Sequence, residues 1–349
     1  MKISEIDKNF KIETKIQKPQ IAFFDAKSSP IEIDGVFYEN GAFRRMPEKI
    51  AKSVSEGVYW LHSNTAGGRI RFRTDSPYVA ISAKMPSVCK MSHFPISGSA
   101  GYDLYADNEY AGSFIPPFDV DASYEGVVEL KGRKMREITV NMPTYSGVCE
   151  LYIGLDNTSS IQAPTPYKIE KPIVFYGSSI TQGGCSSRPG NTYQAIVSRA
   201  LDANYINLGF SGNARAEDEM SDYVKNLDMS AFVYDYDHNA PTLEHLCKTH
   251  EKMFKAIREQ NPTLPIVIMS RPKYTLTADE KKRLAVIKQT YENALASGDK
   301  NVYLITGREL MKIAKNDGTV DNCHPNDLGF YSTATSLLKV LKQIFKEEK

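Results

Sequence analysis

Short runs in which apolar and polar residues alternate fill the chain from about residue 20 to residue 160. Residues 69–74 (RIRFRT) precede the turn residues Asp75-Ser76-Pro77, and the same texture returns at residues 78–81, 138–143 and 149–154. Alternation with a period of two indicates half-buried antiparallel strands. No amphipathic helical pattern stands out between these runs, so this region predicts a β-sandwich of the jelly-roll kind.

The pattern changes after residues 156–166, a polar and proline-bearing stretch that suits a short linker. Strand-like apolar runs now alternate with helical patterns. The runs are at residues 173–176, 205–208, 231–234, 265–269 and 302–305, and the helical patterns are at 193–201, 218–227, 243–257, 277–298 and 330–345. Five such alternations predict a parallel sheet with helices on both faces, whose functional sites lie at the carboxyl ends of the strands. We therefore expect a β-sandwich domain over residues 1–165 and an α/β domain over residues 166–349.

Composition narrows the set of partners. The 349 residues include 43 Lys and Arg against 42 Asp and Glu, so the formal net charge is +1. This balance gives no general attraction to nucleic acid or to an anionic membrane, and we expect a neutral or small partner. The oligomeric state stays open, with a homodimer as one option.

Five widely spaced cysteines without a CxxC pair argue against a disulfide framework and favour a reducing compartment. The first residues lack the apolar core of a signal peptide, and no run approaches the roughly 20 apolar residues that span a bilayer. The expected location is the cytoplasm, unless a signal peptide has been removed.

The first chemical candidate follows the apolar run of residues 173–176, which stops at Gly177-Ser178-Ser179-Ile180-Thr181. A buried strand that ends this way delivers Ser179 to the edge of the sheet. A serine at a strand end is more often a turn residue, because its hydroxyl bonds the local backbone well. Thr181 also breaks the G-x-S-x-G pattern of the α/β-hydrolase elbow. A nucleophilic role therefore needs support from elsewhere in the chain.

Asp321-Asn322-Cys323-His324-Pro325 offers that support, in a loop before the last helix. A carboxylate three residues before an imidazole can hold one ring nitrogen, which leaves the other to take a proton from a serine. Asp-x-x-His is common by itself, and a helix-capping or surface role is the competing interpretation.

Three blocks in the right order resemble the SGNH (GDSL-like) hydrolase family over about residues 170–349. Residues 177–180 are similar to its Gly-Asp-Ser-Ile/Leu block, residues 207–213 (NLGFSGN) to its glycine block, and residues 321–324 to its Asp-x-x-His block. The resemblance implies an acyl-ester hydrolase with a flavodoxin-like fold. Residues 101–105 (GYDLY) also resemble the G-x-D-L-Y motif of a β-domain that precedes some bacterial SGNH hydrolases.

Carried over position by position, the resemblance assigns catalytic roles. It implies that Ser179 is the nucleophile, that His324 is the general base and then the acid, and that Asp321 orients His324. The implied oxyanion hole consists of the backbone N–H groups of Ser179 and Gly212 and the side-chain amide of Asn239. The sequence departs from the family in two places. Ser178 replaces an aspartate, and the third block, usually Gly-x-Asn-Asp, reads YDHNA at residues 236–240.

Several further side chains have a functional and a structural interpretation. Asp235, Asp237 and His238 could ligate a metal, although buried hydrogen-bonded residues are the simpler account. We expect no metal and no organic cofactor. Trp60 could stack on a sugar, but a single tryptophan in an alternating strand is more often core. The remaining candidates are Arg188 and Arg215, which could contact substrate or be solvated, Asp103, which is expected to be structural, the loop at residues 90–95, which could reach over the site, and Arg69, Arg71 and Arg73, which are expected to form a solvated strand face.

The leading hypothesis is a serine esterase that removes small acyl groups, most readily acetyl, from xylo- or manno-oligosaccharides through an acyl-serine intermediate. The sugar rests on the family resemblance alone. A lysophospholipase, thioesterase or platelet-activating-factor acetylhydrolase-like activity is the first alternative, and it would require an apolar acyl channel. A non-catalytic carbohydrate-binding protein with relic blocks is the second.

Overall fold

The computed structural model describes residues 14–347, which form two compact units. The first contains the chain up to Arg45, then Ser63–Pro166 and Ser187–Gly190, and the second contains Met46–His62, Tyr167–Ser186 and the chain from Asn191 onward. The chain thus passes between units at Pro166, beside the expected boundary between residues 165 and 166. The segments Met46–His62 and Ser187–Gly190 each belong to the unit opposite to the one that the sequence suggested.

Two antiparallel sheets form the first unit, with the strand orders β1-β11-β6-β9 and β12-β5-β10-β7-β8. The main strand pairs are nested in sequence: the first of their strands pairs with the last, and each later pair lies between the two strands of the pair before it. They are β1 (Ile21–Asp25) with β11 (Glu150–Asp156), β5 (Arg69–Thr74) with β10 (Arg136–Asn141), β6 (Tyr78–Lys84) with β9 (Ser123–Glu129), and β7 (Tyr102–Ala106) with β8 (Glu109–Phe114). Such nesting across two sheets is a jelly roll, as predicted.

Shorter elements complete this unit. β12 (Ile161–Gln162) and β2 (Glu32–Asp34) both pair with β5, and β3 (Phe37–Glu39) forms a hairpin with β4 (Ala42–Arg44). Side chains from both sheets, such as Phe72 and Ile153, meet in one buried apolar core. The region is therefore a true sandwich and not a single layer.

The second unit contains a five-stranded parallel sheet, as predicted, with the order β14-β13-β15-β16-β17. The strands are β13 (Ile169–Gly177), β14 (Ala203–Gly209), β15 (Ala231–Asp235), β16 (Ile266–Met269) and β17 (Val302–Ile305). Gly177 is in register with Gly209 on one side and with Asp235 on the other. The carboxyl ends of the three adjacent strands therefore meet at one edge of the sheet.

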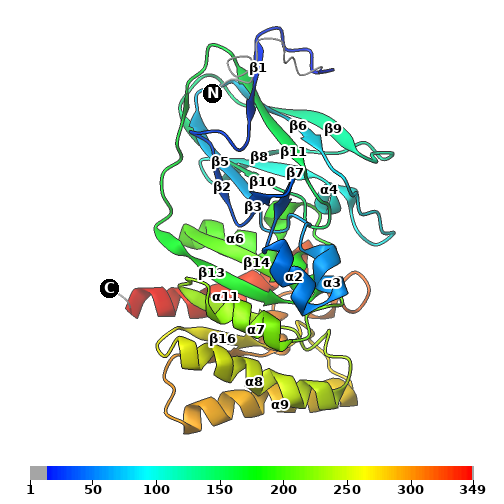
Figure 1. Cartoon of the computed structure of the whole chain (residues 1–349), viewed down its shortest axis with the longest axis vertical. Helices are drawn as coiled ribbons and strands as arrows, with labels where there is room; N and C mark the ends of the chain where they lie inside the picture. The colour runs from blue at the N-terminus through cyan, green and yellow to red at the C-terminus, as the bar shows by residue number, and fades with distance from the viewer. Residues whose placement is uncertain (1–13, 348–349) are drawn as a thin grey trace. The chain divides into compact units, whose positions relative to one another are not determined.

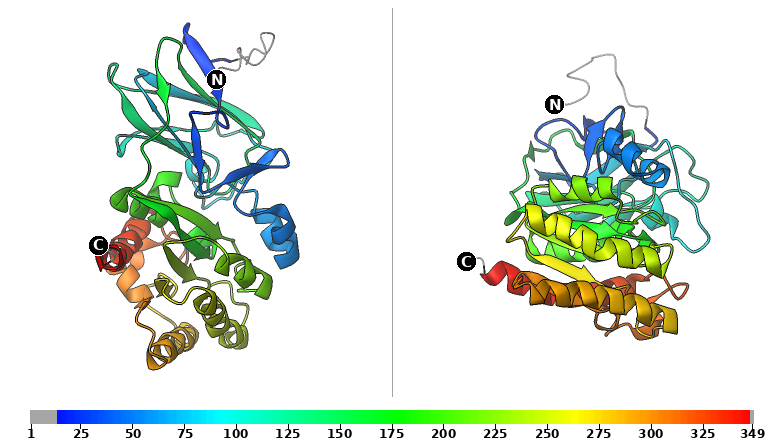
Figure 2. Two further views of the ribbon diagram at one scale, coloured as in Figure 1. Left: turned by 60° about the vertical axis from the view of Figure 1, so that its left-hand side comes forward. Right: turned by 60° about the horizontal axis from the view of Figure 1, so that its bottom comes forward.

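Helices cover both faces of this sheet, and the side chains of β13 show the alternation. Ile173 and Phe175 pack with α6 (Tyr193–Leu201) and α11 (Asp327–Glu347). Val174 and Tyr176 pack in the core formed with α7 (Asp218–Lys225), α8 (Leu243–Gln260) and α9 (Ala278–Ala296), which lie together in Figures 1 and 2. None of the helices within residues 14–347 is both long and apolar enough to cross a membrane.

The expectation that no helix interrupts the first region was wrong. α2 (Glu48–Val54) and α3 (Glu56–Leu61) form a helical pair, and a single turn, α4 (Ile96–Ser99), follows later. Ala51, Val54 and Val58 are buried in the core of the second unit. Trp60 lies on α3 with 69% of its surface exposed, so its placement in a strand core was wrong as well. Helices of seven and six residues are too short for their apolar stripe to be recognised.

The expected solvated arginine face of β5 was wrong for Arg69 and Arg71, which are 2% and 7% exposed. Arg71 donates from Nη2 to the carbonyl of Thr165 at 2.6 Å and lies 3.4 Å from the carboxylate of Asp34. Flanking segments that the alternation does not reveal supply these acceptors, and they allow a charged side chain to be buried.

Candidate active site

Ser179 begins the short helix α5 (Ser179–Gln182), which starts directly after β13 and is largely buried. Ser178 is the N-cap of this helix, and its hydroxyl accepts the N–H of Ile180 at 3.2 Å. The backbone N–H of Ser178 donates to the carbonyl of Asp235 at 3.1 Å and ties the turn to the next strand. Serine and aspartate are comparably good N-caps. Ser178 therefore retains the capping function that an aspartate would supply at this position.

His324 connects Ser179 with Asp321. Its Nε2 lies 2.8 Å from Ser179 Oγ, and its Nδ1 lies 2.7 Å from Asp321 Oδ2. Burial alone would raise the pKa of Asp321, but the hydrogen bonds from His324 and from the backbone N–H of Cys323 outweigh it and lower that pKa to about 2. An ionised carboxylate can only accept, so Nδ1 carries the ring proton and Nε2 is left to accept the proton of Ser179.

The loop that carries His324 is closed on itself. A β-bridge joins Thr319 to Pro325, and the N–H of Val320 donates to the carbonyl of His324 at 2.9 Å. Asp321 Oδ1 accepts the backbone N–H of His324 at 2.7 Å. The carboxylate thus holds both the ring and the main chain of the same histidine, which fixes the orientation of the imidazole.

Gly212 and Asn239, the other expected members of the site, lie on neighbouring segments. Gly212 belongs to the turn after β14, in which the N–H of Ala214 donates to the carbonyl of Phe210 at 3.1 Å. The same N–H of Ala214 approaches Asn239 Oδ1 at 3.3 Å. Because the carbonyl oxygen of the Asn239 amide faces this turn, its NH₂ group points away from Ala214. The structure thus brings Asn239 beside the Gly212 turn.

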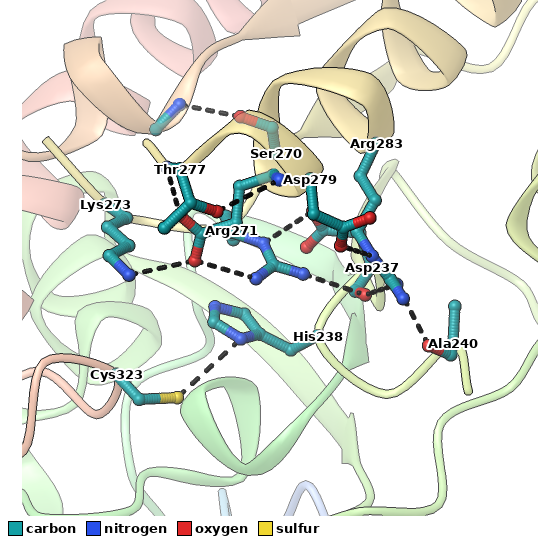
Figure 3. A network of polar contacts seen from close by, with 12 residues as sticks. Asp237, His238, Ala240, Ser270, Arg271, Lys273, Thr277, Asp279, Arg283 and Cys323 are labelled. Carbon is teal, nitrogen blue, oxygen red and sulfur yellow. Dashed lines mark hydrogen bonds and ion pairs between the residues drawn. The ribbon is translucent and has the colours of Figure 1, made fainter. Parts of the chain in front are cut away.

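Asp235 ends β15, and Asp237 and His238 follow it; the two aspartates are buried and the histidine is half-buried. Figure 3 shows Asp237 and His238. Burial, and then the charge of Asp237, raise the pKa of Asp235 well above its usual value. Neither carboxyl oxygen of Asp235 has a hydrogen-bond partner among the described residues. Burial and the charge of Arg271 lower the pKa of His238, whose Nδ1 lies 3.7 Å from Cys323 Sγ. Both side chains are therefore held neutral.

Cations surround this cluster on the side of β16. Arg271 Nε contacts Asp237 Oδ2 at 3.0 Å, and Arg283 donates to the carbonyl of Asp237 at 2.9 Å (Figure 3). Arg271 and Lys273 also bind Glu280, at 3.2 and 2.8 Å. Asp237 is already paired with Arg271, and Asp235 and His238 are held neutral, so these residues do not fit the metal site that their composition suggested.

The two candidate substrate arginines differ in their surroundings. Arg188 is bound in the first unit, where its Nη1 lies 2.8 Å from Asp103 Oδ2. Arg215 is exposed and donates to the carbonyl of Gly212 at 3.4 Å. Sequence reasoning missed the partnership of Arg188 with Asp103, because the two residues are 85 positions apart and each has an ordinary neighbourhood.

A serine at the end of a parallel strand, joined through a histidine to a carboxylate in the loop before the last helix, defines a serine hydrolase of the flavodoxin-like fold. The chain belongs to the GDSL-like lipase/acylhydrolase family, whose model matches residues 170–342. A second model, the N-terminus of SGNH-hydrolase-type esterases with its GxDLY motif, matches residues 21–161. The protein is therefore a carboxylic ester hydrolase, as expected.

Solved structures agree with this assignment. A protein described as a GDSL-like lipase from Bacteroides ovatus is 28% identical, with a TM-score of 0.83 over 93% of this chain and 98% of its own. The salicylyl-acyltransferase SsfX3 from a tetracycline biosynthetic pathway is 20% identical (TM-score 0.75, 94% and 98%). A family two carbohydrate esterase from Clostridium thermocellum is 14% identical (TM-score 0.62, 90% and 99%). At the last two identities the likeness shows the fold alone. No curated protein matches the chain in sequence.

Proposed function

We propose that the protein is a serine esterase that removes small acyl groups, above all acetyl, from xylo- or manno-oligosaccharides. The observation that carries this proposal is the continuous chain of hydrogen bonds from Ser179 through His324 to Asp321, at 2.8 and 2.7 Å. These are hydrogen-bond distances at which a proton can pass from the hydroxyl to the ring.

In this mechanism Ser179 Oγ bonds to the ester carbonyl carbon while its proton moves to His324 Nε2. The imidazolium that forms is stabilised by ionised Asp321 and then gives this proton to the leaving sugar oxygen, which breaks the ester bond and leaves an acyl-serine. Water attacks the acyl-serine, His324 takes its proton and returns it to Ser179 Oγ, and the carboxylic acid departs.

We assign the oxyanion hole to the backbone N–H groups of Ser179 and Gly212 and to the Asn239 amide. Negative charge develops on the carbonyl oxygen in the transition state, so preplaced donors stabilise that state more than the bound ester. The contact between Asn239 Oδ1 and the Ala214 N–H supports the assignment, because it holds the amide beside the Gly212 turn and uses its oxygen, not its NH₂ donor.

Two observations support a sugar-bearing substrate. The carbohydrate esterase from Clostridium thermocellum shares the fold along nearly its whole length. In addition, Trp60 is 69% exposed on α3, and this helix lies against the Gly212 turn, since a side chain on Gly57 would overlap Asn213 Oδ1 at 1.9 Å. Trp60 lies on the same helix, and its exposed indole face suits a sugar ring, whose C–H groups pack well on aromatic faces.

The test measures acetate release from acetylated xylo- and manno-oligosaccharides, together with a series of 4-nitrophenyl esters of increasing acyl length. We expect acetate release, the highest rate on the acetyl ester, and no turnover by Ser179→Ala. We also expect Trp60→Ala to raise KM for the oligosaccharides but not for the 4-nitrophenyl esters. Leu295→Ala, which removes an exposed apolar side chain from α9, should leave KM for both kinds of substrate unchanged.

Other outcomes would replace the proposal. Rates that rise with acyl length would favour a lysophospholipase- or thioesterase-like activity. Glycan binding without labelling of Ser179 by a fluorophosphonate would favour a non-catalytic binding protein. Full activity of Ser179→Ala would refute the mechanism.

A further inference from the structure

Residues 183–192, called the segment below, follow Ser179 and contact both Ser179 and the surroundings of His324. The N–H groups of Gly183 and Gly184 donate to the carbonyl of Ser179 at 3.1 and 2.8 Å. Cys185 Sγ lies within 4.8 Å of a ring nitrogen of His324. Further along, Asn191 Nδ2 donates to Asp327 Oδ2 at 2.9 Å, at the start of the helix that follows the His324 loop. A shift of this segment would therefore change the positions of Ser179 and His324.

The middle of this segment, Ser187–Gly190, packs within the first unit. The carboxylate of Asp103 is fully buried, and its Oδ2 accepts Arg188 Nη1 and the backbone N–H of Gly190, both at 2.8 Å. Its Oδ1 accepts Asn141 Nδ2 at 2.7 Å. Three donors thus converge on one carboxylate, and two of them come from the segment.

Aromatic side chains complete the grip on Arg188. The hydroxyl of Tyr105 accepts Arg188 Nη1 at 2.7 Å, and the guanidinium lies 4.0 Å from the ring centroid of Tyr110. Ser97 Oγ donates to the carbonyl of Ser187 at 2.7 Å. Gly190 is packed so closely that a β-carbon there would lie 2.6 Å from Asp103 Oδ2. These contacts leave the segment little freedom to move.

This arrangement explains the GYDLY pattern of residues 101–105. Successive side chains of a strand point to opposite faces, so Asp103 and Tyr105 share one face while Leu104 points to the other. Leu104 is buried in the sandwich core, and the other two bind the segment. A buried carboxylate is costly unless it is paired. Without the segment, Asp103 would keep only its hydrogen bond with Asn141, so its carboxylate serves the segment and not the sandwich core.

We propose that Asp103 is a positioning residue, which acts through Arg188 and Gly190 to fix the segment that joins Ser179 to the neighbourhood of His324. The sandwich is then a working part of the esterase and not an appended module. The expected change in kcat rests on the proposed esterase function. Hydrogen exchange of the segment can be measured without any substrate.

The experiment compares Asp103→Asn and Arg188→Met with the control Arg133→Met in the full chain. Arg133 is matched to Arg188, because it also binds a sandwich carboxylate, Asp156, at 2.8 Å, but it contacts no residue of the segment. Three quantities are measured: kcat and KM on 4-nitrophenyl acetate, the rate at which a fluorophosphonate labels Ser179, and hydrogen exchange of peptides that cover residues 183–192.

We expect both test variants to lose roughly 10- to 100-fold in kcat, with KM within about twofold, because small misplacements of reacting groups have effects of this size. Labelling of Ser179 should slow in parallel, and exchange should rise over residues 183–192 while strands β5 and β10 keep their protection. Arg133→Met should stay within about twofold of the wild type. A purely structural role would lower the protection of the sandwich strands and leave kcat per folded molecule unchanged.

Tyr105→Phe decides the matter if the first two variants do not fold, because it removes a single hydroxyl that contacts Arg188 and Gly190. It should lower kcat about two- to fivefold and loosen the segment. Folded variants with wild-type kcat and unchanged exchange over residues 183–192 would overturn the inference. If the wild type hydrolyses no ester, the proposed function fails, and the exchange comparison still decides whether Asp103 holds the segment.

Discussion

The carboxyl groups of Asp321, in the loop before the last helix, and of Asp235, at the end of β15, have pKa values shifted in opposite directions. Asp321 is 35% exposed in its side chain and is surrounded by N–H donors, which lower its pKa to about 2 in spite of partial burial. Asp235 is fully buried without a partner among the described residues, and burial and Asp237 raise its pKa. One carboxyl is held charged and the other is held neutral within the same unit.

The difference indicates which group can serve the reaction. In the proposed mechanism, a charged carboxylate can stabilise the imidazolium that forms when His324 takes the Ser179 proton, whereas a neutral buried acid cannot. We therefore interpret the region after β15 as a support for Asn239, which Arg271 and Arg283 hold through their contacts with Asp237. The following variants are designed to break or sharpen this comparison.

Asp321→Asn should have the largest effect. The amide can no longer hold the Nδ1–H tautomer or stabilise the imidazolium, so kcat should fall on the order of a thousandfold to ten-thousandfold. Steady-state kinetics on 4-nitrophenyl acetate measures the loss, and Asp235→Asn is the matched control, with an expected change of less than about threefold. A greater loss in Asp235→Asn than in Asp321→Asn would reverse the roles of the two carboxyl groups.

Asn239→Asp tests whether the β15 region supplies a reacting group at all. The substitution retains an oxygen that can accept the N–H of Ala214 but removes the amide donor. The loss of one oxyanion donor raises the barrier by about 3 kcal/mol, so kcat should fall by roughly a hundredfold or more. Thermal unfolding should change little. Unchanged kcat in a folded Asn239→Asp enzyme would remove this residue from the oxyanion hole.

Arg271→Met tests the stability of the support. Arg271 contacts buried Asp237 and also Glu280, so its loss leaves a buried charge short of a partner and should cost about 3 kcal/mol of unfolding free energy. Lys248→Met is the control, because its pair with Glu244 is exposed and should be worth at most about 1 kcal/mol. Urea denaturation measures both. Equal losses in the two variants would mean that the cations of Figure 3 do not stabilise the cluster.

Asp235→Asn tests the neutral carboxyl through pH. A carboxyl whose folded pKa is raised lowers stability as pH rises above its unfolded value of about 3.9, by up to about 1.4 kcal/mol per pH unit until its folded pKa is reached. Asparagine carries no such penalty, so the variant should gain stability over the wild type as pH increases. Denaturation curves at pH 4.5 and pH 8 measure the gain, and a difference that does not grow with pH would show that Asp235 is ionised in the folded protein.

Much of this architecture follows from the sequence, and the exceptions have physical reasons. The five strand-helix alternations of the second unit are visible because each apolar stripe is long enough to repeat, as in α8 with Leu246, Met253 and Ile257. The Ser179–His324–Asp321 set depended on the family resemblance, since serine and Asp-x-x-His are each common. The pair α2–α3 is too short to show a period. The partners of Asp103 and Arg71 are invisible because their contacts join distant parts of the chain.

Ser178 connects the two regions, and its variants give the smallest expected effect. Its hydroxyl caps the helix that begins with Ser179, while its N–H binds the carbonyl of Asp235. Ser178→Ala removes only the cap, which should cost about 1 kcal/mol of stability and lower kcat a few-fold, because the first turn of α5 then holds Ser179 less firmly. Ser178→Asp keeps an acceptor for the Ile180 N–H. If capping is what matters at this position, urea denaturation and kcat should both place Ser178→Asp closer to the wild type than Ser178→Ala. The opposite order would mean that a charge beside buried Asp235 outweighs the cap.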